Sequence, residues 1–345
     1  MAKTITVFSN KGGVGKTFVA INMATALALK GQRVLILDLD FQAGHDMARM
    51  LNLAPRHSLV DYFSQNTPDS DVANIKKFVS PHSSGLEFLP AVSHMKQVGH
   101  ITPDNIRPFL KKISGLYDFI IIDAGSSFGE SMITVLDCSN LILIVATPDI
   151  LAVYQIKYCI EMLQSLHYPL KMIKLVLNRA QSSGGVAWQE VKEALNLDIF
   201  SLIPSDGKTV GLALNRGVPC VIDSPKSKVA EAFIGIADNL RKDDIYVQST
   251  DVVRERSSEG TKPKDHFWEK MGVQGQAASS SAFKPEEDEI IKLKKNIHQR
   301  LVDRMDIRKI TPEALADPAQ AQKIRKTAEN IVVELMTEMA GAMIS

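Results

Sequence analysis

The clearest chemical signal in the sequence is a glycine-rich string near its beginning. Residues 9–17 read Ser-Asn-Lys-Gly-Gly-Val-Gly-Lys-Thr and follow a short β-rich run at 3–8. Glycines let backbone N–H groups point at phosphate oxygens, and the start of a following helix adds positive charge. A lysine and a hydroxyl at the end of such a string reach the β- and γ-phosphates and Mg²⁺. The string therefore predicts a phosphate loop with these nucleotide contacts: Gly12, Gly13, Val14, Gly15, Lys16 and Thr17.

Aspartates at the ends of apolar runs are the second signal. Asp38 and Asp40 follow the run 34–37, and Asp123 follows the run 119–122. Side chains two residues apart on a strand share a face, and the carboxyl ends of parallel strands border the ligand crevice of an α/β sheet. A carboxylate is a suitable ligand for Mg²⁺. We therefore expect Asp123 to lie at a Mg²⁺ site and Asp38 and Asp40 to face the ligand crevice; the alternative for this pair is two solvated strand-end aspartates.

The elements that would position these residues alternate along the first 245 residues. Apolar runs of strand length lie at 3–8, 34–37, 86–89, 119–122, 141–145, 172–177 and 199–203. Segments of helix length lie between or after them, at 15–30, 104–114, 150–166, 188–195 and 226–242. Continuous apolar strands that alternate with helices are typical of a parallel sheet. The predicted fold class is α/β, a mostly parallel sheet covered by helices on both faces, over residues 1–245.

The sequence changes character after this domain. Residues 246–285 are rich in Ser, Gly and Pro and have no sustained period, which is typical of a flexible linker. Within residues 286–345 apolar side chains recur at spacings of three and four, as on amphipathic helices. We therefore predict a small C-terminal all-α module at 286–345 that recruits a partner.

Composition restricts the class of protein. The 345 residues carry 40 Lys+Arg and 39 Asp+Glu, and a net charge of +1 argues against a strongly basic nucleic-acid coat. Cys138, Cys159 and Cys220 lie far apart, so neither a disulfide framework nor a metal cluster is expected. The sequence shows neither a signal-peptide run nor an apolar run long enough to span a membrane. We therefore expect a cytoplasmic protein.

The string KGGVGKT at 11–17 resembles the deviant Walker A motif of the MinD/ParA family. Asn10 replaces the first glycine of ordinary phosphate loops, and Lys11 stands beside the glycines. The resemblance implies a P-loop ATPase that uses ATP and Mg²⁺ and forms a homodimer on ATP binding. In that dimer Lys11 would contact the phosphates of the other subunit. It also implies that Asp40 orients the attacking water. The catalytic residues would be Lys11, Lys16 and Asp40, and the residues that hold Mg²⁺ would be Thr17, Asp38 and Asp123.

Two later segments are similar to the part of the family that surrounds the base. Asn178 and Arg179 follow the run 172–177, where the family has an adenine-contacting Asn. An amide can donate to and accept from the adenine edge. The stretch 203–219 resembles the family's late loop beside the base, which would place Pro204 and Asp206 near the nucleotide. The resemblance covers residues 1–245.

Outside these motifs the sequence resembles the TadZ/CpaE branch, which localises Tad/Flp pilus machinery. Segments 146–149 and 213–219 carry this resemblance, and residues 290–339 are similar to the N-terminal helical region of CpaF/TadA-type secretion ATPases. The resemblance implies an ATPase that positions or assembles a pilus or secretion machine. Its partner would bind at 286–345, with peripheral membrane contact at the inner face or cell pole.

Two alternatives to this function stay open. The first is a plasmid or chromosome partition ATPase, and the second is a nucleotide-binding scaffold with negligible hydrolysis. Only Arg241 and Lys242 form a basic cluster at the end of the domain, directly before two aspartates. No sequence-specific nucleic-acid partner is therefore expected.

Overall fold

The computed structural model describes residues 1–41, 46–65, 72–126, 129–182 and 184–247. The chain falls into two units, Met1–Val273 and Gln274–Ser345, and every described residue belongs to the first. The predicted helical module at 286–345 and nearly all of the predicted linker lie outside the described residues. Of the linker, Tyr246 and Val247 are described, and both pack against the domain.

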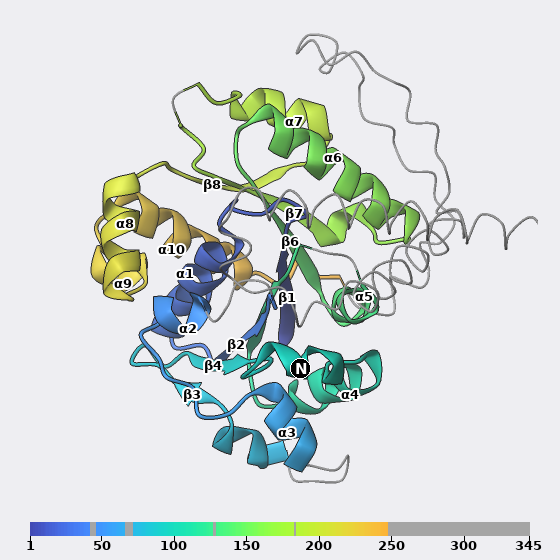
Figure 1. The fold of residues 1–345 in the computed structure, drawn as a ribbon. Coiled ribbons are helices and arrows are strands. Elements are labelled where there is room, and N and C mark those ends of the chain that lie inside the picture. The colour runs from blue at the N-terminus through green and yellow to red at the C-terminus, as the bar shows by residue number, and fades with distance from the viewer. Residues whose placement is uncertain (42–45, 66–71, 127–128, 183, 248–345) are drawn as a thin grey trace, which may run out of the picture. The chain divides into compact units, whose positions relative to one another are not determined.

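An eight-stranded sheet forms the centre of the described domain (Figure 1). Its strand order is β3-β4-β2-β5-β1-β6-β7-β8, and every described pairing is parallel except the one between β3 and β4. The strands are β1 (Lys3–Phe8), β2 (Val34–Leu39), β3 (Ser80–Pro81), β4 (Glu87–Pro90), β5 (Phe119–Ala124), β6 (Leu141–Ala146), β7 (Ile173–Asn178) and β8 (Ile199–Ile203). The predicted fold class is confirmed. Most strands end one or two residues beyond their apolar runs, because residues such as Asp38 and Asp123 still pair in the sheet.

Helices cover both faces of this sheet, as Figure 1 shows. They are α1 (Lys16–Leu29), α2 (Asp46–Met50), α3 (Leu59–Gln65), α4 (Pro103–Ile113), α5 (Glu130–Asp137), α6 (Ile150–Ser165), α7 (Trp188–Leu195), α8 (Gly207–Arg216), α9 (Cys220–Asp223) and α10 (Lys228–Leu240). The described residues also form three 3-10 helices, each between a strand and an α-helix: η1 (Val72–Lys77), η2 (Met95–His100) and η3 (Leu170–Met172). In the described part of the chain, no helix is long and apolar enough to cross a membrane.

Alternate residues of the central strands pack on opposite faces of the sheet. Ile36 and Ile121 belong to the cluster that contains the buried residues of α1 and α10. Leu37 and Ile122 belong to the cluster on the other face, with residues of α3 and α4. Because side chains alternate along a strand, the next residues with the parity of Ile36 and Ile121 are Asp38 and Asp123. The packing of the strands therefore directs both carboxylates to the α1 side.

The structure corrects one predicted element. The sequence predicts a loop over 203–219, but residues 207–216 form helix α8. The Asp206 carboxylate caps this helix by accepting a hydrogen bond from the Thr209 N–H at 3.0 Å. Gly217 ends it in the left-handed conformation, with φ of 64°. Asp before and Gly after a segment are local helix signals, which the resemblance to a family loop obscured.

Candidate nucleotide site

The predicted phosphate loop connects β1 to α1. Gly13 and Gly15 have φ of 75° and 93°, a conformation that glycine adopts without a steric penalty. The Lys11 N–H donates to the Ser9 hydroxyl at 3.3 Å, and the Gly15 carbonyl accepts the N–H of Val19 in the first turn of α1. The loop therefore leads directly into a helix N-terminus, whose free N–H groups and dipole attract anions.

Lys16, at the end of this loop, forms an ion pair with Asp40. The Lys16 Nζ lies 3.6 Å from Asp40 Oδ2, and the two side chains are only 7% and 10% exposed. The Asp40 N–H donates to Asp38 Oδ1 at 3.1 Å. Gly125, just after β5, lies so close that an added Cβ would stand 3.5 Å from Asp40 Oδ1. Asp40 thus lies between the phosphate-loop lysine and the residue that follows β5.

Asp123 is the most deeply buried carboxylate of the site. It is 0% exposed, and neither of its oxygens accepts a hydrogen bond within normal geometric limits. Burial raises the pKa of Asp123 well above its ordinary value, and the charge of Asp38 adds to this, while the Thr17 hydroxyl and the Lys16 charge oppose it. Burying the charge of a carboxylate is costly unless a cation neutralises it.

Asp38 lies next to Asp123, since the two are register partners in the β2–β5 pair. Burial raises the pKa of Asp38 to about 7, although the hydrogen bond from the Asp40 backbone opposes this shift. The two neighbouring carboxyl groups therefore share an environment that favours an added positive charge.

These residues fit a Mg²⁺ ion bound together with a nucleotide. Among the described residues, no group of three or more His, Cys, Asp or Glu could hold a metal by itself. Mg²⁺ commonly takes one or two protein oxygens and completes its shell with phosphate oxygens and water. Thr17, Asp123 and, through water, Asp38 would hold it, and the ion would neutralise charge on the phosphates.

The Lys11 side chain contacts a residue outside the phosphate loop. Its Nζ forms an ion pair with Asp149 Oδ1 at 2.6 Å. Asp149 also caps α6, accepting from the Ala152 N–H at 2.9 Å and from the Thr147 hydroxyl at 2.7 Å. Burial raises the pKa of Asp149, but the Lys11 ammonium and these donors outweigh burial and leave it below its ordinary value. Sequence reasoning missed Asp149, although an Asp before an apolar helix is a recognisable cap signal.

The residues predicted to surround the base come from two neighbouring strands. Asn178 ends β7 opposite Ile203 of β8, so Pro204 and Asp206 leave the sheet beside it. The Asn178 amide donates to the Val14 carbonyl at 2.8 Å and accepts from the Arg179 N–H at 3.0 Å. The Arg179 side chain is exposed. The adenine contact of these residues stays a prediction, and the contact between Asn178 and the phosphate loop is one that the sequence did not predict.

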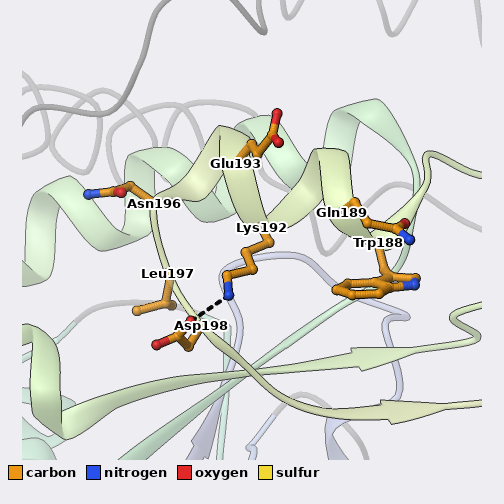
Figure 2. A pocket seen from close by; sticks show the side chains of 7 residues that line it. All are labelled: Trp188, Gln189, Lys192, Glu193, Asn196, Leu197 and Asp198. Carbon is orange, nitrogen blue, oxygen red and sulfur yellow. Dashed lines mark ion pairs between the residues drawn. The ribbon is translucent and has the colours of Figure 1, made fainter.

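A surface pocket of about 510 Å³ lies at α7 and the start of the following segment (Figure 2). Within it the Lys192 ammonium forms an ion pair with Asp198 at 2.8 Å. Its lining residues are Trp188, Gln189, Lys192, Glu193, Asn196, Leu197 and Asp198. None of them belongs to the phosphate loop or to the carboxylate cluster, so the pocket is separate from the candidate site.

The site combines a glycine loop, a lysine and a hydroxyl at the start of α1, and buried carboxylates at the ends of neighbouring strands. Positioned cations and N–H groups of this kind stabilise the charge that develops on a transferred phosphoryl group. These features define a P-loop ATPase that uses ATP and Mg²⁺.

Comparison with known proteins gives the family. A family model described as an AAA domain matches residues 2–175, which is 174 of the chain's 345 residues. The chain belongs to this family, and within it the chain is an ATPase of the MinD/ParA type. The septum site-determining protein MinD of Thermotoga maritima is 24% identical over 256 residues, which cover 72% of this chain and 92% of that protein.

Two solved structures share the fold. MinD from Pyrococcus horikoshii, complexed with Mg-ADP, has a TM-score of 0.61 and 24% identity, with 70% of this chain and 97% of that chain covered. The ParA family ATPase from Chlorobium tepidum has a TM-score of 0.65 and 23% identity, with 70% and 100% covered. The similarity to these structures spans about the length of the predicted 1–245 domain.

Proposed function

We propose that this ATPase dimerises when it binds ATP, and that Lys11 then contacts the nucleotide of the second subunit. The observation that carries the proposal is the ion pair between Lys11 and Asp149 at the start of α6. It pairs the Lys11 ammonium with a residue outside the phosphate loop, and 26% of the Lys11 side chain stays exposed. A cation that completes the site only in trans links triphosphate binding to assembly.

Light scattering with and without Mg·ATP tests this step. Asp40→Ala should bind ATP and stay dimeric, because Lys16, Thr17 and Asp123 remain while the water loses its orienting carboxylate. Lys11→Ala should bind ATP but dimerise poorly. Lys77→Ala, which removes an exposed lysine outside the site, is the matched control. A monomeric Asp40→Ala protein in saturating ATP would contradict the proposal.

Asp149→Asn sharpens the same test. Asn caps a helix about as well as Asp, so α6 should be retained while the charge that holds Lys11 is lost. We expect the ATP-dependent dimer to form at a several-fold lower protein concentration than in the wild type. A weaker dimer would mean that Asp149 supports the assembled state rather than the separate subunit.

The cellular role that we propose is to position a pilus or secretion assembly of the Tad/Flp type. Its support is the resemblance of segments 146–149 and 213–219 to the TadZ/CpaE branch, together with the composition of the tail. We propose residues 1–245 as the ATPase domain, 246–285 as a linker and 286–345 as the recruitment module. Through this module the protein would reach its partner, at the inner membrane face or cell pole.

Pull-down with the full chain tests this role. Leu335→Asp, which places a charge on the apolar stripe predicted for the tail, should abolish co-purification of pilus or secretion components. ATP turnover should stay at the wild-type level. Loss of ATP binding in this variant would show that the tail belongs to the ATPase core, and the proposed two-module organisation would then be wrong.

A partition ATPase is the second candidate. A ParA family ATPase shares its fold with this chain. Partition would require non-specific DNA binding through phosphate contacts, whose affinity falls steeply with salt. Co-sedimentation with DNA across a salt series therefore separates the two roles. Salt-sensitive, ATP-dependent DNA binding would favour partition over pilus positioning.

A further inference from the structure

Asn178 reaches the phosphate loop across 164 residues of sequence. Its Nδ2 donates to the Val14 carbonyl oxygen at 2.8 Å, and this hydrogen bond is buried. Val14 itself is 1% exposed and Asn178 is 5% exposed. A buried carbonyl needs a partner, and the side-chain amide of Asn178 provides it.

The phosphate loop packs against the Asn178 amide at Gly15, where there is no room for a side chain. A Cβ added to Gly15 would stand 2.5 Å from Asn178 Nδ2, closer than real Cβ contacts come. On the other side of the amide, Oδ1 accepts the Arg179 N–H at 3.0 Å. Arg179 has φ of 55°, the left-handed region that non-glycine residues rarely adopt. The Asn178 amide is therefore positioned by the end of β7 and packs directly against the phosphate loop.

This hydrogen bond fixes the direction of a loop N–H group. The peptide between Val14 and Gly15 is planar, so its N–H points opposite to its carbonyl. Because the carbonyl points at Asn178, the Gly15 N–H must point away from it. The N–H groups of a phosphate loop are themselves ligands of the phosphates, so their direction affects phosphate binding directly.

We propose that Asn178 is a positioning residue of the phosphate loop, which orients the Val14–Gly15 peptide and so strengthens binding of the phosphate chain whether or not a base is attached. The adenine contact predicted from the sequence can coexist with this role. The amide keeps a second N–H and a second lone pair beyond those used here. The inference requires the ATP site only, and neither the dimer nor the partner.

Binding of two ligands to the full-length protein tests the proposal. Calorimetry would compare Mg·ATP with inorganic triphosphate plus Mg²⁺, which has the phosphates but no base. Asn178→Ala removes the donor without adding charge near the phosphates. We expect the affinity for both ligands to fall by roughly tenfold, and by similar factors, because the Val14 carbonyl is left unpaired.

Asn140→Ala is the matched control. Asn140 accepts from the Thr4 N–H at 2.9 Å and donates to the Val247 carbonyl at 3.2 Å, at the start of β6, so it also joins distant parts of the chain. Its loss should lower the melting temperature and leave triphosphate affinity unchanged. If Asn178→Ala does not fold, Asn178→Ser serves instead, since its hydroxyl is too short to reach Val14.

Two outcomes would overturn the proposal. If triphosphate binds Asn178→Ala as well as it binds the wild type while ATP binds more weakly, Asn178 contacts only the base. If neither affinity changes, the hydrogen bond does not affect phosphate binding. Hydrogen exchange of the loop amides adds a readout independent of ligand, and it should be faster in Asn178→Ala than in Asn140→Ala.

Discussion

The two ends of strand β5 place aspartates in opposite environments. Asp118, just before the strand, accepts a hydrogen bond from the Arg33 guanidinium at 2.7 Å, with 36% of its side chain exposed. Asp123, near the end of the strand, is fully buried and accepts no hydrogen bond within normal limits. The guanidinium lowers the pKa of Asp118, whereas burial raises the pKa of Asp123.

The difference separates the amino end of β5, where an ion pair stabilises the fold, from its carboxyl end, which lies at the candidate site. Charges at the amino end of β5 are already satisfied within the chain, so they stabilise the fold modestly. At the carboxyl end, the buried Asp123 oxygens accept no hydrogen bond, and burial disfavours the charged form of both Asp123 and Asp38. Binding sites commonly retain such unfavourable environments, because the ligand then relieves them.

The largest expected effect comes from Lys16, which begins α1. Lys16→Ala should lower ATP turnover by at least about a hundredfold, since a positioned cation on the phosphates is lost. Lys30 follows the other end of the same helix and pairs with Asp238 on the surface at 2.8 Å. Lys30→Ala should keep wild-type turnover. The rate of phosphate release measures the turnover of both variants. Equal turnover of Lys16→Ala and Lys30→Ala would contradict the functional difference between the two ends of α1.

Asp38 gives an intermediate effect that depends on pH. Its pKa is about 7 in the folded protein against an ordinary 3.8, so the folded state holds the proton more tightly. Its contribution to the free energy of unfolding is therefore fully present below the ordinary pKa of 3.8 and is lost as the pH rises through 7. The slope from this group is at most roughly 1.4 kcal/mol per pH unit.

Asp38→Asn should remove this pH dependence in the nucleotide-free protein. The variant should be more stable than the wild type at pH 8, because a buried charge is gone, and its Mg²⁺-dependent turnover should be lower. Urea unfolding between pH 4 and 8 measures the first effect. A variant less stable than the wild type at pH 8 would show that Asp38 has stabilising partners in the folded state.

The smallest effect is expected at Asp118. Its lowered pKa gives the opposite sign, so its stabilisation is present above the ordinary value and is lost as pH falls through the folded-state pKa. Asp118→Asn should cost less than about 1 kcal/mol at pH 7, because the pair with Arg33 is exposed. ATP turnover should not change. A large loss of turnover would mean that this edge also supports the site.

Much of the site follows from local sequence patterns. Residues 9–17 predict the loop because glycine, lysine and threonine have restricted uses after a strand, and the structure places them between β1 and α1. The apolar runs before Asp38 and Asp123 predict buried strands, and β2 and β5 are buried along their whole length. The helix at 207–216 was missed although its Asp206 cap and terminal Gly217 are local signals.

The sequence by itself determined the phosphate loop, the strand-end carboxylates and the α/β class, since each depends on neighbouring residues and on a period of two or about four. Only the tertiary structure decided which distant groups meet. The strand order places β5 between β1 and β2, so that Asp123 pairs with both Val7 and Asp38. It also brings Asn178 to Val14 and Asp149 to Lys11. These contacts depend on how strands cross over and order themselves in the sheet, which local periodicity does not encode.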